Sequence, residues 1–186
     1  MSPNVAGSDQ RLPDDPFPDG QVPDDLLTVH VLGLPLGVQL RAQQHGDELT
    51  REFTLIGEQL RQQGNTGDLP TRLVSLIGKL TSRYSVFTTE QEQQFADALR
   101  TDVTTIDLTY RVPISAAGAA KELGDILDEA DEYCRAGKYL LTLATPADLV
   151  VYRRWFLDQF VSQGAGNPPV SWADYSEGLP GSVRGA

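Results

Sequence analysis

The chain has 186 residues and a formal net charge of −11, with 40% hydrophobic and 22% charged residues. This length and composition are typical of one globular domain, and the acidic balance argues against partners such as nucleic acid or an anionic membrane surface. The single cysteine excludes an intrachain disulfide, and the sequence lacks the run of about 18 apolar residues that a membrane-spanning helix requires. We therefore expect a cytoplasmic protein.

The composition divides the chain into three parts. Residues 1–25 hold six aspartates against Arg11 and few large apolar residues, which predicts a disordered acidic tail. Residues 26–163 form the predicted folded domain. Residues 164–186 are rich in Gly and Pro and predict a C-terminal tail, although Trp172 and Tyr175 offer side chains that could pack on the domain.

Apolar residues at helical spacing predict a long helix over residues 35–64. One narrow arc of it holds six apolar residues and His45, and Pro35 suits its first turn. The six are Val38, Ala42, Leu49, Phe53, Ile56 and Leu60. At 1.5 Å per residue this helix is about 40 Å long, which favours a bundle.

The same period predicts further helices over 69–87, 116–137 and 146–164, with a short helix over 90–99. Asp68 and Thr145 stand at cap positions, and Pro70 and Pro146 stand in first turns. The expected fold class is all-α: a four-helix bundle with an irregular crossover between the second and third long helices.

Residues 106–112 of this crossover alternate apolar and polar side chains, which is the period of a strand. They either pair with residues 27–31 as a two-stranded ribbon or lie on the bundle as an extended crossover. An isolated pair of strands is only marginally stable, so the sequence leaves both alternatives open.

Arg153 falls in the middle of the apolar arc of the helix over 146–164. A guanidinium in that position needs a carboxylate partner, since an unpaired buried charge is prohibitive. Glu48 and Glu52, on the same edge of their helix as His45, are candidates. The residues Arg153, His45, Glu48 and Glu52 thus either surround a site for a small, anionic ligand or form a structural ion pair that sets the helix register.

No catalytic or metal site is expected. His45 precedes Glu48 in the reverse of the Glu-x-x-His order of di-metal bundles, so a hydrogen-bonded core histidine is favoured over a ligand. The acidic residues of 125–132 predict a solvated face or a docking surface. Cys134 lies in an apolar stripe and acidic surroundings, which does not favour a reactive thiolate. No cofactor-binding motif is present.

The helix over 146–164 also has apolar residues on the face opposite its core arc. Val151 and Trp155 lie there beside Arg154. A helix that is apolar on two sides is covered on two sides, by the tails of the chain or by another molecule. A surface for self-association or a protein partner, built from Val151, Arg154 and Trp155, is the favoured interpretation.

Five segments resemble an uncharacterised group of helical proteins from high-GC bacteria. They are LTREFTLI (49–56), DLTYRVP (107–113), DEADEYCRAG (128–137), LLTLATP (140–146) and RRWFLDQFV (153–161). The resemblance covers about residues 26–163 and implies a neighbourhood of anti-sigma-type kinases, phosphatases and their antagonists. It carries no catalytic motif, so it implies a role in a phosphorylation-controlled partner switch and no functional residue.

The favoured function is that of a non-enzymatic regulatory or protein-interaction protein in bacterial signalling, in the form of a dimer. The alternative is a sensor that binds a small ligand between helices, around Arg153 and His45. An enzyme of unknown class comes third. A sensor should contain a cavity of a few hundred Å³ with convergent polar groups, whereas a partner-binding protein should expose an apolar patch near Trp155.

Overall fold

The computed structural model describes residues 25–64, 69–136 and 144–177. Within them the chain forms helices and a pair of strands. The elements are β1 (Leu26–Pro35), α1 (Leu36–Gln62), α2 (Leu69–Tyr84), the 3₁₀ turn η1 (Ser85–Phe87), α3 (Thr89–Ala98), β2 (Thr105–Pro113), α4 (Ala116–Arg135), α5 (Ala147–Gly164) and α6 (Trp172–Glu177). The helices predicted over 35–64, 90–99 and 146–164 are confirmed to within two residues at each end. Asp68 and Gly137, predicted as helix boundaries, lie outside the described residues.

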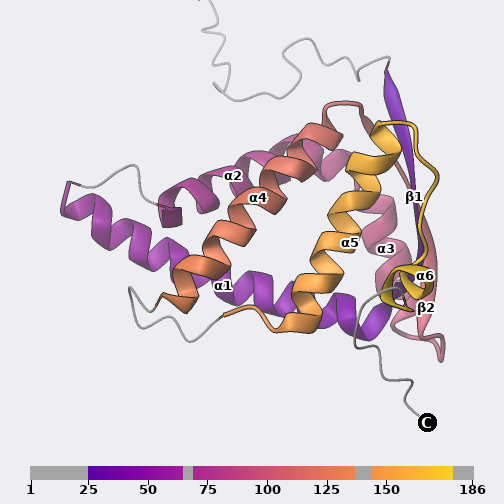
Figure 1. The fold of residues 1–186 in the computed structure, drawn as a ribbon, viewed down its shortest axis with the longest axis horizontal. Coiled ribbons are helices and arrows are strands. Elements are labelled where there is room, and N and C mark those ends of the chain that lie inside the picture. Colours follow the sequence, from indigo (N-terminus) through magenta and orange to yellow (C-terminus); the bar gives the residue numbers. More distant parts are fainter. Residues whose placement is uncertain (1–24, 65–68, 137–143, 178–186) are drawn as a thin grey trace, which may run out of the picture.

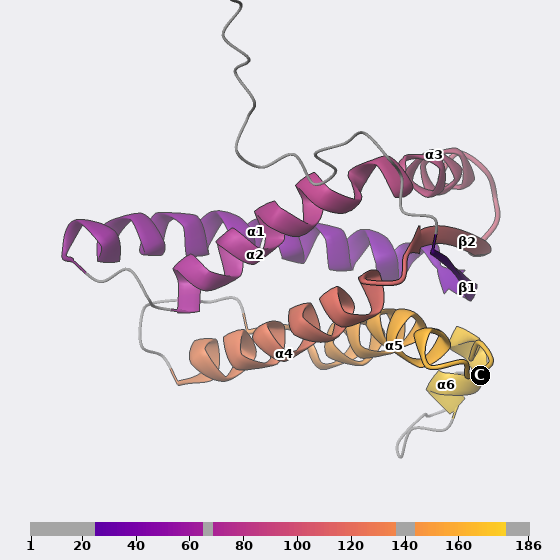
Figure 2. The same cartoon turned by 90° about the horizontal axis from the view of Figure 1, so that it is seen from above.

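The four long helices pack in two layers. In Figure 2, α1 and α2 lie in one layer and α4 and α5 in the other, while Figure 1 shows α4 and α5 side by side. Contacts join α1 to α2, α2 to α4, α4 to α5 and α5 to α1, so the helices enclose a common interior. This is the bundle that the helical periodicity predicted.

The all-α class, however, is wrong, because β1 and β2 pair as a two-stranded antiparallel sheet. Leu26 lies opposite Pro113 and Pro35 opposite Thr105, with an irregularity between Val31 and Leu34. Gly33 sits in this irregularity with φ of +68°, a conformation that glycine adopts at little cost. The fold is therefore mixed, mainly helical, and of the two alternatives for the crossover the structure shows the ribbon.

The ribbon is stable because one of its faces belongs to the core. Val29, Val31, Leu108, Tyr110 and Val112 alternate inward and are all at least 90% buried. They share a cluster with residues of α3 and α5, and Figure 1 shows the ribbon beside both helices at one end of the bundle. Period-two alternation thus supplies the apolar face that a lone pair of strands lacks.

A second apolar cluster fills the other end of the bundle. It joins α1, α2 and α4 through residues that include Phe53, Leu73 and Ala130. The two clusters draw on different halves of α1. The cavity described below lies where α1, α4 and α5 meet along their length.

The segment 165–177 that follows α5 packs back on the domain. Val170 bonds to α5 through its carbonyl oxygen and its amide, and Trp172 packs against the cluster that contains the ribbon. The composition had predicted a tail from residue 164 onward. Residues 1–24 and 178–186, the rest of the predicted tails, lie outside the described residues.

Candidate ligand-binding site

A cavity of about 370 Å³ lies between α1, α4 and α5. Most of its wall is apolar: Ala42, Gly46, Leu49, Leu123, Leu127, Leu149, Phe156 and Leu157. The polar residues that line it are Gln39, Gln43, His45, Thr145, Tyr152 and Arg153. Mainly apolar walls with a few convergent polar groups are typical of sites for small molecules.

Small side chains on α1 help to create this cavity. Ala42 and Gly46 stand four residues apart on α1, on the same face, and line it. A Cβ atom built on Gly46 would meet no atom within 4 Å. The space beside Gly46 is therefore open, and a larger side chain at this position would enter it.

Arg153 links the cavity to a partly buried ion cluster. Its side chain is 14% exposed and its Nη2 donates to Asp128 Oδ1 and to Asp131 Oδ2, the second bond at 2.9 Å. Arg154 also donates to Asp128, at 3.0 Å. Two guanidinium groups thus face two carboxylates, and the cluster carries no net charge.

Two further properties of the cluster bear on its chemistry. Burial of the Asp128 carboxyl raises its pKa, but hydrogen bonds from Arg154 and Arg153 and their positive charge outweigh this, so the pKa lies below its ordinary value. The Nε of Arg153 is buried and has no hydrogen-bond partner in the described part of the chain. An unsatisfied buried donor costs about 1–3 kcal/mol, so this N–H lowers the net contribution of the cluster to stability.

The carboxylate partners of Arg153 come from α4, and the expected partners on α1 are not used. Glu48 is exposed, Glu52 is half-buried, and neither lines the cavity. Asp131, which the sequence placed on a solvated acidic face, has a side chain that is only 5% exposed. The burial of Asp131 could have been predicted from its position in the helix. Leu127 and Cys134 of the apolar stripe stand four residues before it and three after it, on the same face.

His45 lines the cavity from α1 and joins this helix to the residues just before α5. Its Nε2 and the Oγ1 of Thr145 are 3.0 Å apart and form a hydrogen bond. The Tyr152 hydroxyl donates to Gln39 Oε1, which joins α5 itself to α1. Burial raises the pKa of Tyr152, and the hydroxyl stays protonated. His45 and Arg153, far apart in sequence, are thus brought to one cavity.

The predicted partner surface on α5 has a different environment from the one expected. Trp155 is fully buried, Val151 is half-buried, and Arg154 is exposed and bound to Asp128. The Trp155 indole N–H donates to the carbonyl oxygen of Val170 at 2.9 Å. The C-terminal segment of the same chain therefore covers this face, which was the other alternative for a helix that is apolar on two sides.

Cys134 is buried in the cluster of α1, α2 and α4. Burial raises the pKa of its thiol, and the negative charges of Asp131 and Glu52 raise it further. A thiol of this kind is protonated at neutral pH and is a poor nucleophile.

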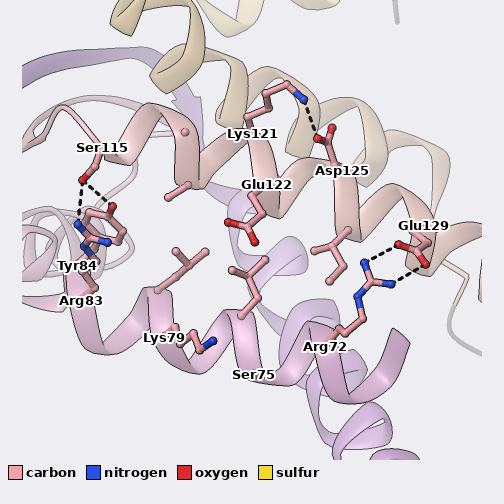
Figure 3. A pocket seen from close by; sticks show the side chains of 15 residues that line it. Arg72, Ser75, Lys79, Arg83, Tyr84, Ser115, Lys121, Glu122, Asp125 and Glu129 are labelled. Atoms are coloured by element: carbon pink, nitrogen blue, oxygen red, sulfur yellow. Dashed lines mark hydrogen bonds and ion pairs between the residues drawn. The ribbon is translucent and has the colours of Figure 1, made fainter. Parts of the chain in front are cut away.

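A second, larger hollow lies on the surface between α2 and α4 (Figure 3). This groove of about 810 Å³ has a floor that includes Leu76, Leu80 and Ile126. Arg72 donates to both carboxylate oxygens of Glu129 across one end, at 3.2 Å each. At the other end the hydroxyls of Tyr84 and Ser115 are 3.1 Å apart. Charged side chains line both rims.

Neither a metal site nor a membrane span is found in the described ranges. No three side chains of His, Cys, Asp or Glu among residues 25–64, 69–136 and 144–177 are grouped so that they could hold a metal ion. No helix in the same ranges is long and apolar enough to cross a lipid bilayer.

Comparison of the chain with protein-family models, with curated proteins and with solved structures gives no significant match. The two hollows and the residues that line them are therefore the basis on which a function can be inferred.

Proposed function

We propose that the protein is a non-enzymatic regulatory protein that senses a small, mainly apolar molecule in the cavity between α1, α4 and α5. The observation that carries this proposal is the meeting of His45 and Arg153 in one cavity of about 370 Å³. That volume lies near the lower end of the range of about 300–1,000 Å³ found for ligand pockets. The single cysteine and the resemblance noted above support a setting in cytoplasmic bacterial signalling.

The charges around Arg153 favour a neutral ligand over the anion that the sequence suggested. Asp128 and Asp131 already compensate Arg153 and Arg154, and an added anion would lie near two carboxylates. A neutral, mainly apolar molecule, such as a ketone or an ester, matches the apolar wall.

The position of the cavity couples ligand binding to the packing of the helices. Its lining residues belong to three helices or stand next to one, and α5 also contacts the ribbon and the C-terminal segment. A ligand that contacts α1, α4 and α5 together favours the arrangement in which all three are closest.

A substitution at Gly46 tests the proposal. Gly46→Phe places an aromatic ring in the cavity, and Gly37→Phe is the matched control, because a Cβ atom at exposed Gly37 also meets no atom within 4 Å. Titration calorimetry with octan-2-one and with octanoate measures binding to each protein. We expect the wild-type chain and Gly37→Phe to bind the ketone more tightly than the carboxylate, and Gly46→Phe to bind neither.

Two results would contradict this function. One is the absence of binding by the wild-type chain to either probe. The other is equal binding by the wild-type chain and Gly46→Phe, which would place the binding site outside the cavity. Tighter binding of octanoate than of the ketone would retain the cavity and reject the neutral ligand.

A regulatory role through protein contacts is the second candidate. Large apolar side chains are exposed on the described surface, among them Val86 at 70%, Leu55 at 67% and Ile114 at 61%. Val86 and Ile114 lie close in the chain to Tyr84 and Ser115, whose hydroxyls meet at one end of the α2/α4 groove. This groove, in place of the covered face around Trp155, is the candidate surface for contact with another molecule.

A further inference from the structure

We propose that the α2/α4 groove is a self-association surface, on which a second copy of the chain lies with its α2 over α4 and its α4 over α2. The groove is lined by residues of these two helices together with Ser115, which directly precedes α4. The proposal adds an assembly to the proposed sensor and depends on different residues from those of its cavity.

The two rims of the groove carry opposite charge. Helix α2 has three cationic residues, Arg72, Lys79 and Arg83, and no acidic residue. On the groove, helix α4 contributes Glu122, Asp125 and Glu129 against Lys121. A surface with one basic side and one acidic side is complementary to a second copy that is rotated by half a turn, so that each basic side faces an acidic side.

The middle of the groove holds one positive and one negative side chain that form no ion pair within the described part of the chain. Arg72 bonds to Glu129, and Lys121 bonds to Asp125 at 2.7 Å. Lys79 and Glu122 have no ion pair or hydrogen bond with any residue that the structure describes, and Figure 3 shows them on opposite helices between the two closed ends. These two side chains are available to a second molecule.

The symmetry follows from the way the helices run. Helices α2 and α4 are antiparallel, because Arg72 near the start of α2 meets Glu129 near the end of α4, and Tyr84 at the end of α2 meets Ser115. A two-fold axis parallel to the helices, lying in the interface, brings α2 of each copy over α4 of the other. Lys79 of each copy then lies over Glu122 of the other, so the interface contains this pair twice.

The shape of the groove allows a close approach. Ser75, Gly118 and Ala119 line it with small side chains, and a Cβ atom built on Gly118 meets nothing within 4 Å. Helix α2 is about 24 Å long and two adjacent helices are about 20 Å wide, which gives about 500 Å² per copy. This is less than the about 800 Å² per partner of a standard interface, so the dimer is weak and reversible.

The charges favour a second copy over other occupants. An acidic segment, such as residues 1–24, would be attracted by α2 and repelled by α4. A foreign helix would need an acidic flank and a basic flank at the right spacing, which the chain itself already provides.

Charge reversal tests the proposal. The variants are Lys79→Glu and Glu122→Lys, with Arg51→Glu and Glu90→Lys, exposed residues of α1 and α3, as matched controls. Sedimentation velocity of the full chain over about 5 to 300 µM spans the range of a weak interface. We expect the wild-type chain and both controls to dimerise, and each groove variant to dimerise at least about tenfold more weakly, because two like-charge contacts replace two attractive ones.

An equimolar mixture of the two groove variants is the decisive sample. In a mixed dimer the carboxylate introduced by Lys79→Glu on one chain meets the ammonium introduced by Glu122→Lys on the other. The second contact joins the unaltered Glu122 and Lys79, so both contacts are attractive and we expect the affinity of the wild-type chain to return. Failure of the mixture to dimerise, or equal weakening by the control variants, overturns the proposal. A wild-type chain that stays monomeric over the whole range also overturns it and leaves the groove to a different occupant.

Discussion

Trp155 and Trp172 pack edge to face, with their ring centroids 5.3 Å apart and their planes at 65°. One ring belongs to α5 and the other begins α6, so the contact fastens the C-terminal segment to the domain. The hydrogen bond from Trp155 to the carbonyl of Val170 lies beside it. An apolar face that the sequence assigned to another molecule is thus part of the protein's own interior.

Truncation of Trp172 should therefore destabilise the whole domain. Trp172→Ala removes a half-buried ring and uncovers Trp155, for which we expect a loss of about 2 kcal/mol in the free energy of unfolding. Ala173→Ser, an exposed position of the same helix, is the control and should change little. Urea denaturation followed by tryptophan fluorescence measures both. Equal stability of Trp172→Ala and wild type would mean that the Trp172 ring does not help to fasten residues 165–177 to the domain.

The pair formed by Arg153 and Asp131 makes a second prediction. Arg153→Met leaves the buried carboxylate of Asp131 without its partner, which should cost about 3 kcal/mol or more. The double variant Arg153→Met/Asp131→Leu removes both charges and should recover most of that loss. Arg154→Met breaks an exposed pair and should cost less than about 1 kcal/mol. Urea denaturation of these variants and the wild type compares them, and a double variant no more stable than Arg153→Met would reject a buried ion pair.

A close approach of two helices makes the third prediction. A Cβ atom on Gly164, at the end of α5, would lie 2.7 Å from the Cβ of Ala117 on α4, and this rigid side chain cannot move aside. Gly164→Ala should lower stability by about 1–3 kcal/mol. Gly78→Ala, in α2, meets nothing within 4 Å and should raise stability by about 0.5–1 kcal/mol. Thermal or urea unfolding compares the two, and opposite signs are the expected result.

The helices could be predicted from the sequence because their signals are local. Apolar spacing, together with prolines such as Pro35 and Pro146 at the helix starts, set most boundaries to within about two residues. The sheet could be recognised only as one of two alternatives. Whether β2 pairs depends on a strand far away in the chain and on the apolar surface of α5, and neither is encoded in the period of residues 105–113.

The candidate site was predicted in part. Arg153 and His45 could be identified because a charge and an imidazole stand among apolar residues on their helices. The partners of Arg153 were assigned to Glu48 and Glu52, since spacing within α1 says nothing about which helix packs against α5. The α2/α4 groove was not predicted at all, because its rims look like ordinary solvated faces when each helix is considered alone.

Acid should remove a contribution to stability that Asp128 makes at neutral pH. Its pKa is lowered in the folded protein, so this contribution is present above the unfolded value of about 3.9 and is lost as the pH falls through the folded-state pKa. The Asp128 side chain is 43% exposed, so solvent screening keeps the effect below about 1 kcal/mol. The stability difference between wild type and Asp128→Asn, measured with urea at several pH values, should shrink toward zero at low pH. A difference independent of pH would show that the charge of Asp128 is not involved.

The pairing of β1 with β2 has a consequence for the rate at which the chain folds. His30 and Thr109, whose side chains meet across the ribbon at 3.2 Å, are separated by 79 positions. Such contacts raise the contact order well above that of an up-and-down bundle, and loop closure of this length must precede any stabilisation by the strands. The kinetics of refolding should accordingly be slower than those of up-and-down helical bundles of the same size.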